Sequence, residues 1–328
     1  MTYAYDIKDC DVVDRQRLQA YRAKRSEWIH LLNGDPDHAV WRQITSMLWN
    51  DAVFRTANEA RRLSRAGGYK SSARNWSIAR FLDQGFVATQ TLSIRKLMER
   101  ASTNPAKQVV SLRRVIDDIV KHRELITREI YVSYDGLPYD SEPGRQAFYQ
   151  AALKRGSGVQ VEWLPTRGPG AWGMAETVHE QFDAISSGGE RSREDLISPD
   201  VFEKIEQELI ESGWKDIAAT GNKFIAHAAD EHSRIDVANG FSLNALEKCH
   251  KAICRVAATI YGSLLYESAM GMFPVPQFNH FENLEEVWLK PNDVTELEKF
   301  WDAHIEKVDA WSNDSVVSSA ATARTESS

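Results

Sequence analysis

The chain has few cysteines, no long apolar run and no apolar leader. Its 328 residues include three cysteines, too few for the disulfide framework of a small secreted protein. No stretch approaches the roughly 20 apolar residues that a membrane-spanning helix needs. The N-terminal MTYAYDIKDCDVVDR lacks the apolar core of a secretion signal. These absences predict a cytoplasmic protein with reduced thiols and no membrane partner.

Signals for phosphate loops and metal centres are also missing. The glycines of LPTRGPGAWG are not followed by the Lys-Ser/Thr pair of a phosphate-binding loop. His250 and Cys254 lie one helical turn apart, but a complete zinc site needs two more ligands. Asp117 and Asp118 likewise lack evident partner ligands. We therefore expect no metal and no cofactor, and we interpret His250 as a core residue and His179 as a solvated one.

Charge is distributed unevenly along the chain. The formal net charge is −7, yet residues 55–128 contain 16 Lys or Arg against 6 Asp or Glu, a local charge of +10. A basic block of this kind is a footprint for phosphate-bearing partners such as RNA. The simpler alternative, which charge counts alone favour, is that these cations lie on the wet faces of helices and pair with acids elsewhere.

Apolar residues recur at helical spacing through most of the sequence, with no internal repeat and no alternation of strand and helix patterns. This periodicity predicts an all-α fold. The predicted helices cover residues 18–32, 35–65, 76–99, 104–119, 146–154, 198–227 with a break at Ser212-Gly213, 243–265 and 294–311.

Composition divides the chain into five predicted parts. Residues 1–132 are the N-terminal helices of a bundle and 133–197 are a loop-rich insertion, with a small hairpin at 159–163. Residues 198–270 are the C-terminal bundle helices, 271–312 an extended arm with a final helix, and 313–328 a disordered tail. Trp163 and Trp172 of the insertion either stack on a base or ligand or hold the loop to the core.

The most informative segment is TGNKFIAH at residues 220–227. Thr, Gly and Asn are each poor helix formers, so their succession inside a helical pattern indicates a site rather than packing. Helical spacing places Lys223 and His227 on one face, whereas Asn222 points away and is expected to brace a neighbouring helix or the backbone. Gly221 indicates a close helix contact or a kink. The alternative is that His227 fills a seam between helices.

Together with the helices before it, this segment resembles the HEPN superfamily of helical bundles, in particular its AbiU-type abortive-infection branch. Asn222-Lys223-Phe224-Ile225-Ala226-His227 is similar to that branch's Arg-Asn-Lys-x-x-Ala-His signature. Residues 78–83 (IARFLD) and 111–119 (SLRRVIDDI) are similar to its Ala-Arg-x-x-Asp and Ser-Leu-x-x-Leu-Leu helices. The resemblance covers about residues 40–130 and 198–268, and it implies a HEPN-like bundle that forms a homodimer.

The resemblance also implies a chemistry. Active members of the superfamily are metal-independent ribonucleases that use an Arg followed, four to six residues later, by a His. His227 matches that His and Asn222 matches the polar residue beside the Arg, but the position of the Arg itself holds Gly221. Because an Arg stabilises the charge that develops on a cleaved phosphate, a substitute is required, and the candidates are Lys223, Arg80 and another Arg of the basic block.

Two functions follow as hypotheses. The first is an RNA endonuclease or RNA-binding effector of phage-defence or toxin type, with His227, Lys223 and Asn222 as the catalytic group. In this hypothesis RNA is also held by Arg80 and by the Arg113-Arg114 pair of the basic block. The second is a non-catalytic helical interaction module that kept the bundle and lost the Arg.

Overall fold

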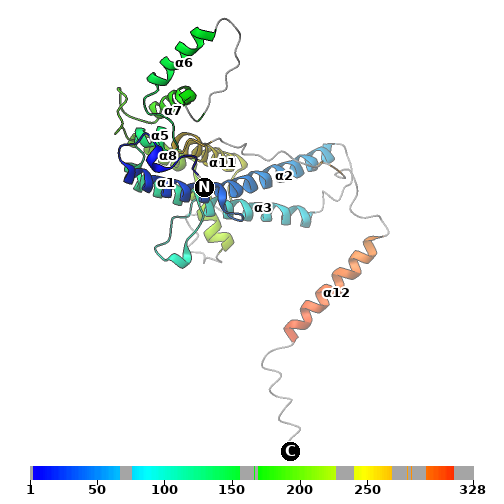
Figure 1. Cartoon of the computed structure of the whole chain (residues 1–328). Helices are drawn as coiled ribbons and strands as arrows, with labels where there is room; N and C mark the ends of the chain where they lie inside the picture. The colour runs from blue at the N-terminus through cyan, green and yellow to red at the C-terminus, as the bar shows by residue number, and fades with distance from the viewer. Residues whose placement is uncertain are drawn as a thin grey trace, which may run out of the picture. The chain divides into compact units, whose positions relative to one another are not determined.

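The computed structural model describes residues 3–66, 76–155, 166, 169–226, 240–267, 279, 282 and 293–313. Over these ranges the chain is helical (Figure 1), and two isolated β-bridges are the only β-structure there. The predicted all-α class is confirmed. No helix within these ranges is both long and apolar enough to cross a bilayer. The predicted hairpin and His227 lie outside the described residues, as does the predicted tail apart from its first residue.

The chain divides into two compact units. The first comprises residues 1–57 and 80–275, and the second comprises residues 58–79 and 276–328. The first unit contains the segment that resembles the HEPN signature. The second unit contains α12 (Val294–Asn313), which agrees with the predicted final helix, together with the end of α2 (Val40–Ala66) and the start of α3 (Trp76–Leu97).

Four elements form the N-terminal part: α1 (Arg15–Ile29), η2 (His30–Gly34), α2 (Val40–Ala66) and α3 (Trp76–Leu97). The second helix begins later than predicted because the Asp35 carboxylate accepts hydrogen bonds from the backbone N–H groups of Asp37 and His38, which form a turn instead. Helices α2 and α3 pack along each other, with the rings of Phe54 and Phe86 stacked 3.7 Å apart.

The predicted helix from residue 104 is wrong at its start. Residues Pro105–Lys107 form a single 3-10 turn, η4, and α4 spans Leu112–Lys121. Ser111 determines this start because its hydroxyl accepts a hydrogen bond from the backbone N–H of Arg114. The elements that follow are η5 (Arg123–Leu125), α5 (Arg128–Ser133), α6 (Glu142–Arg155), η6 (Pro169–Ala171) and α7 (Trp172–Asp183).

Residues 133–197 contain two helices, α6 and α7, where the sequence predicts one. Helix α7 contributes Ala175, Val178 and Phe182 to the main core. The buried guanidinium of Arg128 in α5 fixes it there, through ion pairs with Asp183 at 2.6 Å and Asp195 at 2.8 Å. This part of the chain therefore packs into the first unit through a buried charged group.

The C-terminal part of the first unit contains α8 (Pro199–Glu211), α9 (Trp214–Thr220), η7 (Gly221–Ala226), α11 (Leu243–Ala258) and η8 (Thr259–Leu264). Ser198 caps α8 as expected for Ser-Pro-Asp. The predicted break at Ser212-Gly213 is confirmed, because Gly213 has the left-handed φ of 74° between α8 and α9.

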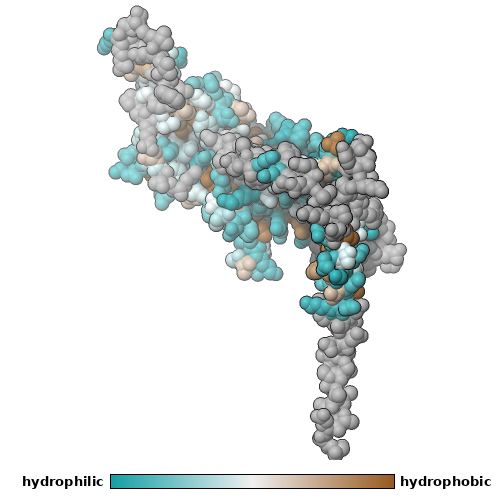
Figure 2. Space-filling model, turned by 90° about the vertical axis from the view of Figure 1, so that its right-hand side faces the viewer, coloured by the Kyte–Doolittle hydropathy of each residue, from teal (hydrophilic) through white to brown (hydrophobic). Residues whose placement is uncertain are grey.

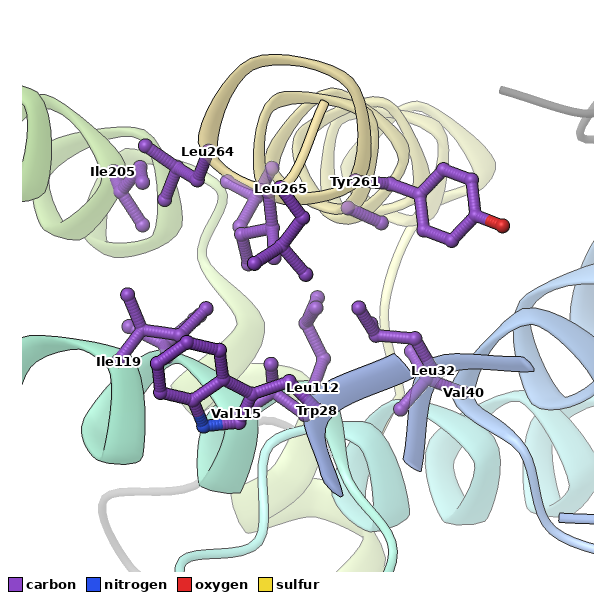
Figure 3. Close-up of a cluster of buried hydrophobic side chains, with 14 of the residues drawn as sticks. Trp28, Leu32, Val40, Leu112, Val115, Ile119, Ile205, Tyr261, Leu264 and Leu265 are labelled. Carbon is purple, nitrogen blue, oxygen red and sulfur yellow. The ribbon is translucent and has the colours of Figure 1, made fainter. Parts of the chain in front are cut away.

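One hydrophobic core holds the first unit together. Figure 3 shows side chains of η2, α4, α8 and η8 converging with Trp28 of α1. The indole N–H of Trp28 donates to Asp118 Oδ2 at 2.7 Å, so the polar edge of this buried ring is satisfied. The buried amide of Gln90 in α3 is also satisfied, because its Nε2 donates to the carbonyl of Met47 in α2 at 3.0 Å.

Candidate functional site

The segment that resembles the HEPN signature is not a regular α-helix. Helix α9 continues at Gly221 into the π-helical turn η7, which carries Asn222 and Lys223. π-helical turns are rare in proteins, and those that occur are often found at functional sites. They also change the angle between successive side chains, so the shared face predicted for Lys223 and His227 from α-helical spacing stays a prediction.

Gly221 is explained by close packing against α3. A Cβ built at this position would clash with Cγ2 of Thr91, a fully buried side chain. The sequence-based expectation of a close helix contact at Gly221 is therefore confirmed. The same contact leaves no room for an Arg at this position while Thr91 keeps its place.

Asn222 is half-buried, and its Oδ1 has no hydrogen-bond partner among the described residues. The expected bracing hydrogen bond is thus not seen within this part of the chain. The hydroxyl of Thr91 likewise has no described partner. Unsatisfied buried polar atoms cost free energy, and α3 and η7 each contain one. Lys223 is also half-buried.

Arg80 lies beside this segment. A cavity of about 560 Å³ is lined by residues of α3, among them Arg80, Gln84 and Val87, and by Thr220 and Ile225 from the other side. Thr220 is buried in this wall. The side chain of Arg80 is exposed and makes no ion pair with a described residue. The structure therefore places the Arg80 guanidinium and the η7 segment at one cavity.

Arg113 and Arg114 are engaged within the fold. Arg113 pairs with Asp117 at 2.7 Å and also with Glu206 of α8. Arg114 donates to the carbonyl of Val109 at 2.8 Å and lies 3.7 Å from Glu27. These contacts favour a structural role for both arginines over contact with RNA.

Other cations of the basic block follow the same pattern. Each of the following is paired with a carboxylate: Arg55 with Asp51, Arg62 with Glu59, Arg100 with Asp117, and Arg128 with Asp183 and Asp195. The local charge of +10 therefore overstates the number of cations that are available to a partner.

A second candidate surface is one that the sequence analysis missed. A cavity of about 680 Å³ between the start of α2 and the end of α3 is lined by Trp41 and Trp49 and by the exposed cations Arg42 and Lys96. Indole rings stack on bases and cations bind phosphates. The spacing of Trp41 and Trp49 is a signal in the sequence, but Lys96 joins them only through the packing of α3 on α2.

The remaining candidates are structural. Nε2 of His250 donates to Oε1 of Gln90 at 3.0 Å inside the core, as the core interpretation requires. His179 is buried and donates to the carbonyl of Tyr139, so its predicted solvation is wrong. Burial lowers the pKa of His179 and favours the neutral ring. Trp172 packs against the rings of Phe148 and Tyr149, whereas Trp163 lies outside the described residues.

Within the described ranges no group of three or more His, Cys, Asp or Glu side chains is arranged to hold a metal ion. All three cysteines are free thiols. Comparison of the chain with protein-family models, with curated proteins and with solved structures gave no match.

Proposed function

We propose that the protein is an RNA-binding effector of the HEPN type, active in the cytoplasm in phage defence or as a toxin, and that it cleaves RNA without a metal. One observation carries the proposal: Arg80 and the η7 segment line the same cavity, and Arg80 makes no ion pair with a described residue. The sequence places His227 directly after η7.

In this proposal His227 takes the proton of the attacking RNA 2′-hydroxyl as general base. The 2′-oxygen bonds to phosphorus, the P–O5′ bond breaks, and the proton passes from the His227 imidazolium to the leaving 5′-oxygen. Arg80 replaces the Arg that Gly221 displaces from the signature, and its guanidinium stabilises the charge on the pentacoordinate phosphorus. Arg80 is a better substitute than Lys223, because the cavity is lined by Arg80 and not by Lys223. Asn222 lies in η7 and contributes its side-chain amide to the proposed catalytic group.

The test is cleavage of total RNA and transfer RNA by the purified full chain in EDTA, with three variants prepared identically. We expect no cleavage by His227→Ala and a rate lowered about 10²- to 10³-fold in Arg80→Ala. Arg145→Ala is the matched control, because Arg145 is an exposed arginine of α6, and it should cleave like the wild type. Equal cleavage by wild type and His227→Ala would contradict the proposal and indicate a contaminating nuclease.

Growth provides an independent readout. Overexpression of the wild-type chain should slow growth, and His227→Ala should relieve the effect. Equal growth arrest by both proteins would count against an RNA-directed toxin.

A non-catalytic interaction module is the second candidate. The contact between Gly221 and Thr91 supports it, because this packing excludes the signature Arg. It predicts a folded protein without RNA cleavage, in which His227→Ala lowers the melting temperature. An unchanged melting temperature would argue against a purely structural His227.

Both candidates include a homodimer. The support is that Phe81 and Leu82, which follow Arg80 on α3, are 74% and 42% exposed. Light scattering with size exclusion should give a dimer for the wild type and a monomer for Phe81→Ser. A wild-type monomer at micromolar concentration would contradict the dimer.

A further inference from the structure

A third cavity of the first unit shares no described lining residue with the two cavities above. Its volume is about 550 Å³, within the range of small-molecule sites. Three tyrosines and two carboxylates give it its character: Tyr131, Tyr134, Tyr266, Asp135 and Glu267.

The two carboxylates each keep an oxygen for a ligand. Arg25 donates to Oε1 of Glu267 at 2.5 Å, and the backbone N–H groups of Ala4 and Tyr5 donate to Oδ1 of Asp135. No described residue pairs with Glu267 Oε2 or Asp135 Oδ2. The cavity therefore presents two acceptor oxygens that are already held in position.

No cation lines this cavity among the described residues. Arg25 is buried behind Glu267, with its guanidinium 4.4 Å from the centre of the Tyr134 ring. Arg22 is buried as well and lies 3.9 Å from Asp135. The lining thus contains two carboxylates, while the guanidinium neighbours of both are buried. This arrangement favours a ligand that is a cation and a hydrogen-bond donor.

The tyrosines of the lining also favour a cationic ligand. Tyrosine faces attract cations and also cover apolar groups. The rings of Tyr131 and Tyr266 meet edge to face at 6.1 Å, and the hydroxyl of Tyr131 donates to the carbonyl of Ser263. Burial raises the pKa of Tyr266, which keeps its phenol neutral.

Tyr266 has a strained backbone. Its φ of 48° lies in the left-handed region, which a bulky side chain rarely adopts. Hydrogen bonds at the two neighbouring residues hold this conformation. Arg25 donates to the carbonyl of Leu265, and the backbone N–H of Glu267 donates to the carbonyl of Tyr261. The result places the ring of Tyr266 and the carboxylate of Glu267 at one cavity. Such strain, where neighbours hold it, gathers at ligand sites.

We propose that this cavity binds a small organic ammonium ion, with the ammonium on Glu267 and Asp135 and its apolar body against Tyr266 and Met174. The proposal is independent of RNA cleavage and holds whether or not the protein is a nuclease.

Three probes with the same phenyl body and different charge test the proposal on the full chain by calorimetry. Phenethylammonium should bind with a dissociation constant below about 1 mM. Neutral 2-phenylethanol should bind at least about tenfold more weakly, and anionic phenylacetate should not bind. Equal binding of all three, or no binding of phenethylammonium, would overturn the proposal.

Gly262 offers a variant that blocks the cavity without disturbing the core. It lines the cavity, and a Cβ at this position meets no atom within 4 Å. Gly262→Leu should fold and lose phenethylammonium binding. Gly85→Leu is the matched control, because a Cβ at Gly85 of α3 also meets nothing and Gly85 does not line the cavity. Full binding by Gly262→Leu would place the ligand elsewhere and contradict the proposal.

The carboxylates are tested by Asp135→Asn, which keeps an acceptor and removes the charge. It should weaken phenethylammonium at least about tenfold and leave 2-phenylethanol unchanged. An equal loss for both probes would show that the substitution disturbs the fold rather than the recognition of charge, and the recognition assigned to Asp135 would then be wrong.

Discussion

Thr91 of α3 lies so close to Gly221 of η7 that a Cβ at position 221 would clash with its methyl group. The two positions are far apart in the sequence, and their contact joins α3 to the segment that resembles the HEPN signature. It explains why position 221 is occupied by a glycine.

Gly221→Ala should destabilise the protein, although alanine is the better helix former. Overpacking of this kind costs about 1–3 kcal/mol. In a Thr91→Ala background, where the obstructing methyl is gone, the same substitution should be neutral or stabilising. Urea unfolding of the two single variants and the double variant measures this coupling. Additive effects would show that the two side chains do not compete for space.

The same contact bears on the introduction of an arginine at position 221. Gly221→Arg inserts a long side chain at a position where a Cβ alone already clashes with Thr91, so we expect loss of folded protein rather than gain of ribonuclease activity. Circular dichroism and yield should be judged against Gly85→Arg, at a position with open space around its Cβ. A folded Gly221→Arg protein would contradict the packing argument.

Arg128→Met should be among the most destabilising single changes. The guanidinium is fully buried and pairs with Asp183 and Asp195. Its removal takes the arginine from Asp195, whose side chain is only 14% exposed, whereas Asp183 keeps Arg191 at 2.8 Å. Breaking one partner of a buried pair typically costs about 3–5 kcal/mol. Arg62→Met is the control, because Arg62 pairs on the surface with Glu59 and its loss should leave the unfolding midpoint nearly unchanged. Similar midpoints for both variants would contradict this account.

Asp118 should contribute a pH-dependent part of the stability. Burial tends to raise its pKa, but the hydrogen bonds from Trp28 and Lys24 outweigh burial and hold the pKa below the ordinary value of 3.8. A carboxyl with a depressed folded-state pKa stabilises fully above its unfolded value, and this stability is lost as pH falls through the folded value.

The difference in unfolding free energy between wild type and Asp118→Asn should therefore be largest near neutral pH and shrink below about pH 4. Urea titrations monitored by the fluorescence of Trp28 and the other tryptophans measure it at pH 7, 4 and 3. A difference that stays constant over this range would show that the ionised form of Asp118 has no special role.

If RNA crosses the cavity between α2 and α3, its affinity should depend on Arg42 and Lys96. Arg42→Gln with Lys96→Gln should lower the slope of log affinity against log salt by about 2. Trp49→Ala should weaken binding of single-stranded RNA by about 1–3 kcal/mol with the slope preserved. Arg145→Gln is the control, and an unchanged slope in the double variant would exclude this cavity as the RNA path.

Much of the local structure could be predicted from the sequence, because its signals act within a few residues. Ser198 and Gly213 mark a helix start and a helix break through their own side chain and backbone. The start of α4 was missed because Asn104-Pro105 and Ser111 are both good caps, and the choice between them depends on which following face can be buried.

The candidate site was less predictable. Arg80, Arg113 and Arg114 are chemically alike in the sequence, yet only Arg80 lacks a carboxylate partner among the described residues. Pairing depends on residues such as Glu27 and Glu206, which are distant in the chain and come near only when the helices pack.

The sequence by itself determined the all-α class and most helix positions, since helical periodicity and capping are local properties. Tertiary structure alone decided that Gly221 packs against Thr91 and that Arg80 lines one cavity with η7. It also decided that Tyr131, Asp135 and Glu267 share a cavity. Such relationships depend on close packing between segments far apart in the chain, which no local pattern encodes.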